Sequence, residues 1–347
     1  MFYLKYRPHT IEDIDNKKVK EVIERILQTS RFSHAFLYVG QKGTGKTSTA
    51  RIFTKAINCL NNKFADKSNK SFEPCNHCSN CKSIDNSSSV DIVELDAASN
   101  RGIDDIKNLI RESNFMPMST RYRVFIIDEA HMITNEGFNA LLKTLEEPPK
   151  SVIFILATTN KEKVPKTIIS RCTLINFGKA NKEDILSMLK RIIVREKITI
   201  DDKLLKLIPS VSENSFRDAT KILEELVIQQ KLTYDEGKNF LGVSRQNFLE
   251  LIEKQNLKEI LGWLTDFYEN DGSIKVLIEQ TLEELRLLLL SKNGLKFEEE
   301  VKSNLTLKEV LKLIKLLTEA YQNLRITPIE SLPLETAMVE FYNLRSK

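Results

Sequence analysis

The sequence lacks a hydrophobic run long enough to cross a membrane. A membrane-spanning helix needs about 18 or more consecutive apolar residues, and the longest candidate, residues 285–290, is interrupted by Arg286. The N-terminus, MFYLKYRPHT, has no apolar segment of the kind found in secretory signals. These absences argue against a membrane protein and a secreted protein. We therefore expect a cytoplasmic location and no membrane partner.

The sequence also contains little glycine and proline, and its net charge is small. The 347 residues include 11 glycines and 9 prolines, too few for a collagen-like chain or a low-complexity disordered chain. The formal net charge is only +4, and the basic excess lies in the first half of the chain. A mildly basic first half is compatible with phosphate or nucleic-acid contacts but requires neither. This length predicts two or three domains.

Cysteine is rare too, but most of the cysteines lie close together. In a cytosolic chain such a cluster more often binds a metal than forms disulfides. Four thiolates can complete a tetrahedral structural Zn²⁺ site, with His77 as a substitute ligand. An iron–sulfur cluster fits the spacing less well, free or redox-active thiols are a further alternative, and Cys172, which stands alone, is expected to be a small buried hydrophobe. The four clustered residues are Cys59, Cys75, Cys78 and Cys81.

Up to about residue 178, short apolar runs alternate with amphipathic segments. This alternation predicts an α/β fold, in which helices cover a parallel sheet. Pro148 and Pro149 are expected to end the last of these helices. The expected strands are 35–39, 91–95, 123–127 and 152–157, and the expected helices are 17–28, 46–58, 104–110 and 135–146.

Beyond residue 178 the strand signals nearly vanish, and the chain is expected to be helical. Gly242 and Ser244 mark a boundary between two helical units. We thus predict an α/β domain at 1–178 with an insertion at 59–82, a small helical domain at 179–242 and a second helical domain at 243–347. The expected helices are 181–197, 201–208, 215–230, 234–241, 273–291, 306–325 and 335–344.

A phosphate-binding loop follows the first expected strand. Residues 40–47, GQKGTGKT, match G-x-x-x-x-G-K-[ST] between a strand and a helix, as the motif requires. Backbone N–H groups of the glycine-rich turn and the helix N-terminus favour phosphate oxygens. Lys46 supplies a charge for the β- and γ-phosphates, and Thr47 a ligand for Mg²⁺; the alternative is a glycine-rich turn of no special function. The residues expected to bind nucleotide here are Gly40, Gly43, Thr44, Gly45, Lys46, Thr47 and Ser48.

Two adjacent carboxylates end the third expected strand. A buried parallel strand delivers them to the carboxyl edge of the sheet, where ligands bind. Asp128 is expected to hold Mg²⁺, directly or through water, and Glu129 to act as the general base for an attacking water. An isolated Asp-Glu pair is commonly just a solvated strand end, but the upstream phosphate loop argues against that here. For His131, a surface or capping role is as plausible as a functional one.

Three further polar positions have competing interpretations. Residues 158–160, Thr-Thr-Asn, end the fourth strand, where they could sense the γ-phosphate or orient water, or simply form a polar turn. Arg171 follows a short helix-like segment and, from the residues alone, is most simply a surface charge. Arg217 stands in the first turn of an expected helix, where it opposes the helix dipole. A phosphate contact would explain that position, although Asp218 can offset the cost.

Together these motifs resemble the gamma/tau subunits of bacterial DNA polymerase III, the ATPases of the sliding-clamp loader. The match is dense over residues 1–220, whereas the C-terminal helices match mainly in general character, with LPLE at 332–335 near the end. A cysteine insertion between the phosphate loop and the Asp-Glu strand, combined with a Ser-Arg-Cys motif, is specific to this family. The matching segments include 6–8, 34–37, 40–47, 94–99, 127–131, 138–149, 157–159, 170–172 and 215–219.

The resemblance implies an AAA+ ATPase module, then a helical lid, then an all-α collar that holds subunits in a ring. It implies ATP, Mg²⁺ and Zn²⁺ as cofactors. Arg7 and Pro8 would belong to an N-terminal nucleotide-binding segment. Thr158, Thr159 and Asn160 would cover the sensor position, with Thr158 expected to bind nucleotide. Arg171 would be the arginine finger that reaches the ATP of a neighbouring subunit. Arg217 would be the lid arginine that contacts nucleotide in its own subunit.

The resemblance also implies partners. A hetero-oligomeric ring, containing other loader subunits and copies of this chain, would bind and open the sliding clamp, and hydrolysis would release the clamp onto primed DNA. Residues 99–101, before an expected helix, are candidate DNA contacts. The chain departs from the family at two points: the segment between Cys59 and Cys75 is longer and more polar, and Asn16 replaces a frequent Gly-Gln pair.

Three other functions compete with this one. Another AAA+ machine, such as a Holliday-junction motor or a replication initiator, is disfavoured by the cysteine insertion and the collar-like tail. A DEAH-type helicase shares the Asp-Glu-Ala-His string, but no second motor domain follows it. A scaffold that binds nucleotide without turnover is disfavoured by the intact phosphate loop and carboxylate pair.

Overall fold

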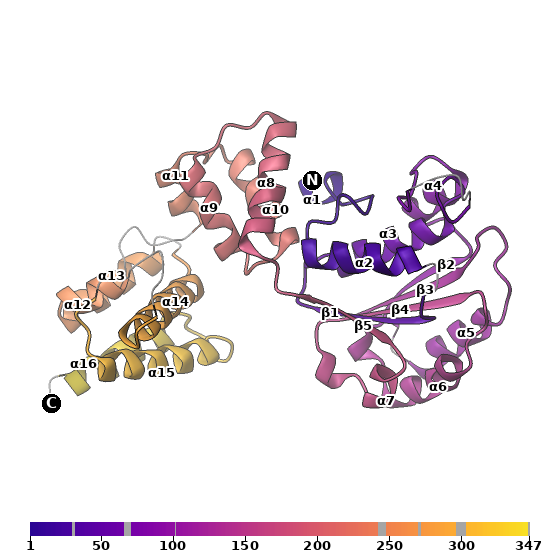
Figure 1. Ribbon diagram of the computed structural model, residues 1–347. Coiled ribbons are helices and arrows are strands. Elements are labelled where there is room, and N and C mark those ends of the chain that lie inside the picture. Colours follow the sequence, from indigo (N-terminus) through magenta and orange to yellow (C-terminus); the bar gives the residue numbers. More distant parts are fainter. Residues whose placement is uncertain are drawn as a thin grey trace. The chain divides into compact units, whose positions relative to one another are not determined.

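The computed structural model describes residues 1–29, 32–65, 71–100, 102–241, 248–269, 272–295 and 303–345. The chain divides into two compact units, one of Met1–Thr199 with Leu205–Glu225 and one of Ile200–Leu204 with Leu226–Lys347 (Figure 1). The expected domain boundaries at 178 and 242 stay predictions, and Gly242 and Ser244 lie outside the described residues. Among the helices described, none is both long and apolar enough to span a membrane.

A parallel sheet forms the centre of the first unit (Figure 1). Its strand order is β2-β3-β4-β1-β5, and every neighbouring pair is parallel. Four strands lie within one residue of their predicted bounds. The sheet consists of β1 (Ala35–Gly40), β2 (Ile92–Asp96), β3 (Arg123–Asp128), β4 (Val152–Thr158) and β5 (Thr173–Gly178).

The edge strand β5 was not predicted from the sequence. Only Ile175 and Phe177 of this strand are buried, while the residues between and before them are exposed. Two buried positions are too few to produce a distinct strand signal. Pairing with β1 is what makes this segment a strand.

Helices cover both faces of the sheet, as an α/β fold requires (Figure 1). Successive residues of a strand point to opposite faces, so Phe36 and Tyr38 pack with α2 and α3, whereas Leu37 packs with α5, α6 and α7. The predicted fold class is therefore confirmed, and α3 and α6 have the predicted bounds. These helices are α2 (Lys17–Thr29), α3 (Lys46–Asn58), α5 (Ile103–Ser113), α6 (Asn135–Glu146) and α7 (Lys166–Ile169).

The remaining elements that belong wholly or partly to the first unit are short helices and turns that precede β5 and the helices that follow it. Two of them, α9 and α10, have residues in both units. The elements are α1 (Phe2–Lys5), α4 (Ser79–Asp85), the 3₁₀ turns η1 (Ala130–Met132) and η2 (Lys161–Lys163), α8 (Lys182–Glu196), α9 (Asp202–Val211) and α10 (Phe216–Ile228).

The second unit is helical throughout its described part, as predicted. Its core is one cluster of buried apolar side chains that includes Leu285, Leu313 and Met338. Thr306 and Glu309 form a capping box that begins α15. The helices are α11 (Tyr234–Phe240), α12 (Phe248–Lys254), α13 (Leu257–Glu269), α14 (Ile274–Lys292), α15 (Leu307–Asn323) and α16 (Leu332–Arg345).

Candidate functional site

The loop between β1 and α3 has the backbone conformation that its glycines allow. Gly43 and Gly45 have φ values of 75° and 92°, in the left-handed region that glycine adopts without strain. A Cβ atom on Gly43 would lie 2.0 Å from Ser215 Oγ, so no larger residue fits there. The N–H of Phe216 donates to Gly43 O at 3.1 Å, which ties the loop to the start of α10. Thr44 is buried, and its hydroxyl donates to Gln41 O at 2.8 Å.

Lys46 lies inside this loop. Its side chain is only 5% exposed, and Nζ donates to Gly40 O at 2.9 Å and Gln41 O at 2.8 Å. Burial lowers the pKa of Lys46, while the nearby carboxylates of Glu129 and Asp128 act to raise it. The carbonyl contacts orient the ammonium group without neutralising its charge. The charge is therefore left to act on a bound anion.

Thr47 and Asp128 lie together at the carboxyl edge of the sheet, as predicted. The Thr47 hydroxyl donates to Asp128 Oδ2 at 2.6 Å. A hydroxyl and a carboxylate oxygen side by side are the hard oxygen ligands that Mg²⁺ prefers. The N–H of Glu129 donates to the other oxygen, Oδ1, at 2.9 Å, and this fixes the carboxylate plane. The donor set thus fits a magnesium ion beside the phosphate loop.

Glu129 has a φ of 47°, a conformation that is uncommon for a residue with a side chain. Its Oε2 accepts a hydrogen bond from the Thr159 hydroxyl at 3.1 Å and lies 3.4 Å from His131 Nδ1. The same His131 nitrogen lies 3.0 Å from the hydroxyl of Thr158, which is fully buried. The polar side chains at the ends of β3 and β4 therefore form one network around the Glu129 carboxylate.

The sequence left the roles of His131 and Thr159 open, although a signal for this network existed. β3 and β4 are neighbouring parallel strands, and their carboxyl ends meet at one edge of the sheet. Residues 128–131 and 158–160 follow those ends directly. Strand order is what the sequence did not reveal.

A cavity of about 340 Å³ opens beside the phosphate loop. Arg7 and Pro8 line it, and Arg7 Nε donates to Ser48 Oγ at 3.1 Å. Arg217 lines it from α10, with its guanidinium carbon 5.2 Å from the centre of the Tyr3 ring. The structure therefore places these predicted residues around one cavity. Tyr6 and Phe216, from the matching segments 6–8 and 215–219, line it too, and other lining residues that carried no motif in the sequence include Tyr3, Ile14, Met188 and Thr220.

Asn16, the departure from the family pattern, also lines this cavity. Its Nδ2 donates to Phe177 O at 3.0 Å, and its Oδ1 accepts from the N–H of Val19 at 3.2 Å. Asn16 therefore joins the start of α2 to the edge strand β5.

Arg171 is not among the residues that line the cavity. It follows α7, forms an ion pair with Glu146 on α6, and donates to Thr167 O at 2.6 Å. Its side chain is 32% exposed. The structure thus presents Arg171 on the surface of the unit, away from the chain's own phosphate loop.

The four cysteines of the insertion form a compact cluster, in which all the Sγ atoms lie within 4.8 Å of one another. Backbone N–H groups point at these sulfur atoms: Cys75 N–H donates to Cys59 Sγ at 3.3 Å, and Cys81 N–H donates to Cys78 Sγ at 3.4 Å. Burial acts to raise the pKa of Cys75, but the N–H groups of His77 and Cys78 prevail, and the pKa is about 6. This donor set fits a metal held by four thiolates.

Three other predicted residues lie outside these sites. Cys172 is only partly buried and packs against the core on the α5–α7 face. Asn100 donates through Nδ2 to Asp96 O at 3.2 Å. Arg101, the charged member of the candidate DNA-contact segment, lies outside the described residues.

Known proteins are similar to this chain over most of its length. A family model described as "DNA polymerase III, delta subunit" matches residues 15–181. The DNA polymerase III subunit gamma of Buchnera aphidicola (subsp. Baizongia pistaciae) is 31% identical over 99% of this chain and 96% of its own length. The DNA polymerase III subunit tau of Bacillus subtilis is 34% identical over 97% of this chain, and the match covers 62% of that relative.

The solved structures that match this chain are more distant. A gamma subunit-related protein of DNA polymerase III from Thermotoga maritima has a TM-score of 0.40 and 19% identity, and the match covers 95% of this chain and 99% of that one. The RuvB branch migration motor of the same organism has a TM-score of 0.48 and 16% identity, over 75% of this chain and 85% of that one.

Proposed function

The chain belongs to the gamma/tau subunit family of DNA polymerase III, and on this premise we propose that it is an ATPase subunit of a sliding-clamp loader. The observation that carries the proposal is the convergence of Lys46, Thr47, Asp128 and Glu129 beside one cavity. A parallel sheet with this phosphate loop after its first strand supports an AAA+ module. The chain spans only 62% of the B. subtilis relative, so functions of the remaining part are not included.

We assign nucleotide binding to the cavity. The phosphates would lie on the N–H groups of the loop, with Lys46 at the β- and γ-phosphates. Arg7 and Arg217 add positive charge from outside the loop. Thr47 and Asp128 would hold Mg²⁺, which neutralises charge on the phosphate oxygens when it is bound.

Hydrolysis is assigned to Glu129. Its carboxylate would take a proton from the water that attacks the γ-phosphorus, as the bond to the β–γ bridging oxygen breaks and ADP leaves. The Thr159 hydroxyl and His131 hold this carboxylate in place. Thr158, buried behind them, would act as the sensor of the γ-phosphate. In this way the network links phosphate binding to the position of the base.

Arg171 would act in a neighbouring subunit. Its partial exposure and its absence from the lining of the chain's own cavity fit a finger that completes another subunit's site. A cationic side chain at the γ-phosphate stabilises charge that develops in the transition state. Shared sites of this kind require neighbouring subunits, and we place them in a ring, in which copies of this chain and other loader subunits would open the clamp and place it on primed DNA. In the same proposal, the helical domain at 179–242 is the lid and the helical domain at 243–347 is the collar.

The cysteine cluster is assigned to a structural zinc ion. We expect about one zinc per chain, because four thiolates complete a closed tetrahedral site. Cys81→Ser should remove the metal and lower the melting temperature by on the order of 10 °C, since loss of a structural metal is among the most destabilising changes. Elemental analysis and a thermal melt test this. Cys172→Ser is the control and should keep its zinc, whereas a metal-free wild type with the same melting temperature as Cys81→Ser would refute the assignment.

The proposed function as a whole is tested by the response of ATP hydrolysis to the sliding clamp and primed DNA. A clamp loader uses both as signals for turnover. We expect hydrolysis by the assembled ring to rise when both are added.

A further inference from the structure

The cysteine insertion and the phosphate loop lie at opposite ends of one helix. α3 begins at Lys46 and has Cys59 as its C-cap. Its 13 residues span about 20 Å. The cysteine cluster and the phosphate loop are therefore too far apart to touch, yet they share a rigid element.

Glu73, two residues before Cys75, links the insertion to a different part of the cavity wall. Its Oε2 accepts from the N–H of Ile11 at 2.8 Å, and its Oε1 accepts from the N–H of Glu12 at 2.9 Å. One carboxylate thus holds two consecutive backbone groups. The segment that it holds is continuous with residues on both sides that line the cavity, namely Arg7 and Pro8 before it and Ile14, Asp15 and Asn16 after it.

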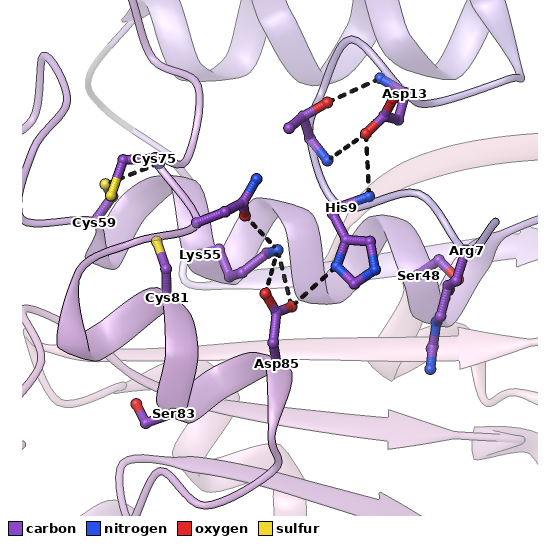
Figure 2. A network of polar contacts seen from close by, with 12 residues as sticks. Arg7, His9, Asp13, Ser48, Lys55, Cys59, Cys75, Cys81, Ser83 and Asp85 are labelled. Atoms are coloured by element: carbon purple, nitrogen blue, oxygen red, sulfur yellow. Dashed lines mark hydrogen bonds and ion pairs between the residues drawn. The ribbon is translucent and has the colours of Figure 1, made fainter. Parts of the chain in front are cut away.

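A buried lysine forms the second link, which Figure 2 shows. Lys55 on α3 is only 1% exposed; its Nζ donates to Asn76 Oδ1 at 2.8 Å and pairs with Asp85 at 2.9 Å. Asp85 in turn lies 3.4 Å from His9 Nδ1. Asn76 directly follows Cys75 in the sequence. Asp85 is the last residue of α4, the helix that contains Cys81. A buried charge that loses its partner is costly, so the insertion must keep its shape for this network to persist.

Both links end on the segment that carries cavity residues, and neither contacts the phosphate loop itself. Asp13 closes this segment on itself, since its Oδ2 accepts from the N–H groups of His9 at 3.4 Å and Thr10 at 3.2 Å (Figure 2). The segment next to Arg7 and Pro8 is therefore contacted by residues that lie close in sequence to Cys75 and Cys81.

We propose that the metal-bound insertion positions residues 7–16 for nucleotide binding through Glu73, so that metal binding and ATP binding strengthen each other. The inference rests on the proposed function, because it takes ATP as the ligand of the cavity. Glu73 is a positioning residue, since it acts on the nucleotide only through the backbone of Ile11 and Glu12. By linkage, the factor by which zinc tightens ATP binding equals the factor by which ATP tightens zinc binding.

The test measures both affinities in the full chain. ATP affinity is measured with a fluorescent ATP analogue on zinc-loaded and chelator-treated protein, and zinc affinity by competition with a chromophoric chelator with and without ATP. We expect each ligand to tighten the other by about tenfold, the effect of one hydrogen bond to a charged group. Glu73→Gln should keep one zinc per chain but lose most of this coupling, because an NH₂ donor replaces one of the two carboxylate oxygens that accept the backbone N–H groups.

A matched control is Glu136→Gln, which changes an exposed carboxylate on α6, on the opposite face of the sheet. This variant should retain the wild-type coupling. Equal ATP affinity in zinc-loaded and zinc-free protein, or full coupling in Glu73→Gln, would overturn the inference. Circular dichroism shows whether the chelated protein has unfolded. If it has, the ATP affinity of zinc-loaded Glu73→Gln decides, and an affinity equal to that of the zinc-loaded wild type would overturn the inference. A wild type that binds zinc but no ATP would overturn the proposed function together with the coupling.

Discussion

A Glu129→Gln protein is expected to bind ATP as tightly as the wild type and to hydrolyse it about 10²–10⁴ times more slowly. The amide has nearly the shape of the carboxylate and can still accept the hydrogen bond from Thr159. It cannot take a proton from water. The substitution leaves Lys46 and the loop, the proposed phosphate contacts, untouched, so the loss should fall on the chemical step alone.

Single-turnover hydrolysis and a separate binding titration distinguish these two effects. Glu162→Gln is a suitable control, because this exposed carboxylate lies near the end of β4 and does not line the cavity. Its rate should match the wild type. Rapid hydrolysis by Glu129→Gln would mean that another group serves as the base. A large loss of ATP affinity instead would place Glu129 in binding rather than in catalysis.

Arg171→Ala is expected to lose about 10³–10⁵ in hydrolysis rate in the assembled ring, the usual effect of an arginine finger. Since Arg171 does not line the chain's own cavity, its removal should leave ATP binding by the isolated chain unchanged. In the structure its guanidinium group pairs with Glu146. On the proposed function, this pair would be exchanged for the phosphate of a neighbouring subunit.

Mixing variants separates a shared site from a local one. Rings that contain both Lys46→Ala and Arg171→Ala subunits should recover hydrolysis that neither variant has alone, because an intact loop can then face an intact finger. Lys166→Ala, an exposed change on α7, the short helix that precedes Arg171, is the control and should remain active. A mixture that stays inactive would remove Arg171 from any role in a neighbouring subunit.

The sequence predicted the parts of the site that local rules determine. The phosphate loop and the Asp128-Glu129 pair each follow a buried strand, and parallel strands bring their carboxyl ends to one edge. α3 and α6 could be bounded correctly because a glycine-rich turn precedes one and two prolines follow the other. These signals lie within a few residues of the element that they define.

The remaining parts depend on contacts between distant segments. β5 is a strand only because it pairs with β1, and its two buried residues gave too weak a pattern. Met188 lines the cavity from α8 as an ordinary apolar residue of an amphipathic helix, so no motif marks it. Glu73 likewise gives no signal in a polar insertion, because its partners lie 61 and 62 residues away.

The most direct test of the account is ATP hydrolysis by the ring assembled with the other loader subunits, measured with and without sliding clamp and primed DNA. The account predicts that clamp and primed DNA together raise the hydrolysis rate of the wild type and that Lys46→Ala does not respond. A wild-type ring that hydrolyses ATP at the same rate with neither, either or both would contradict the clamp-loader function.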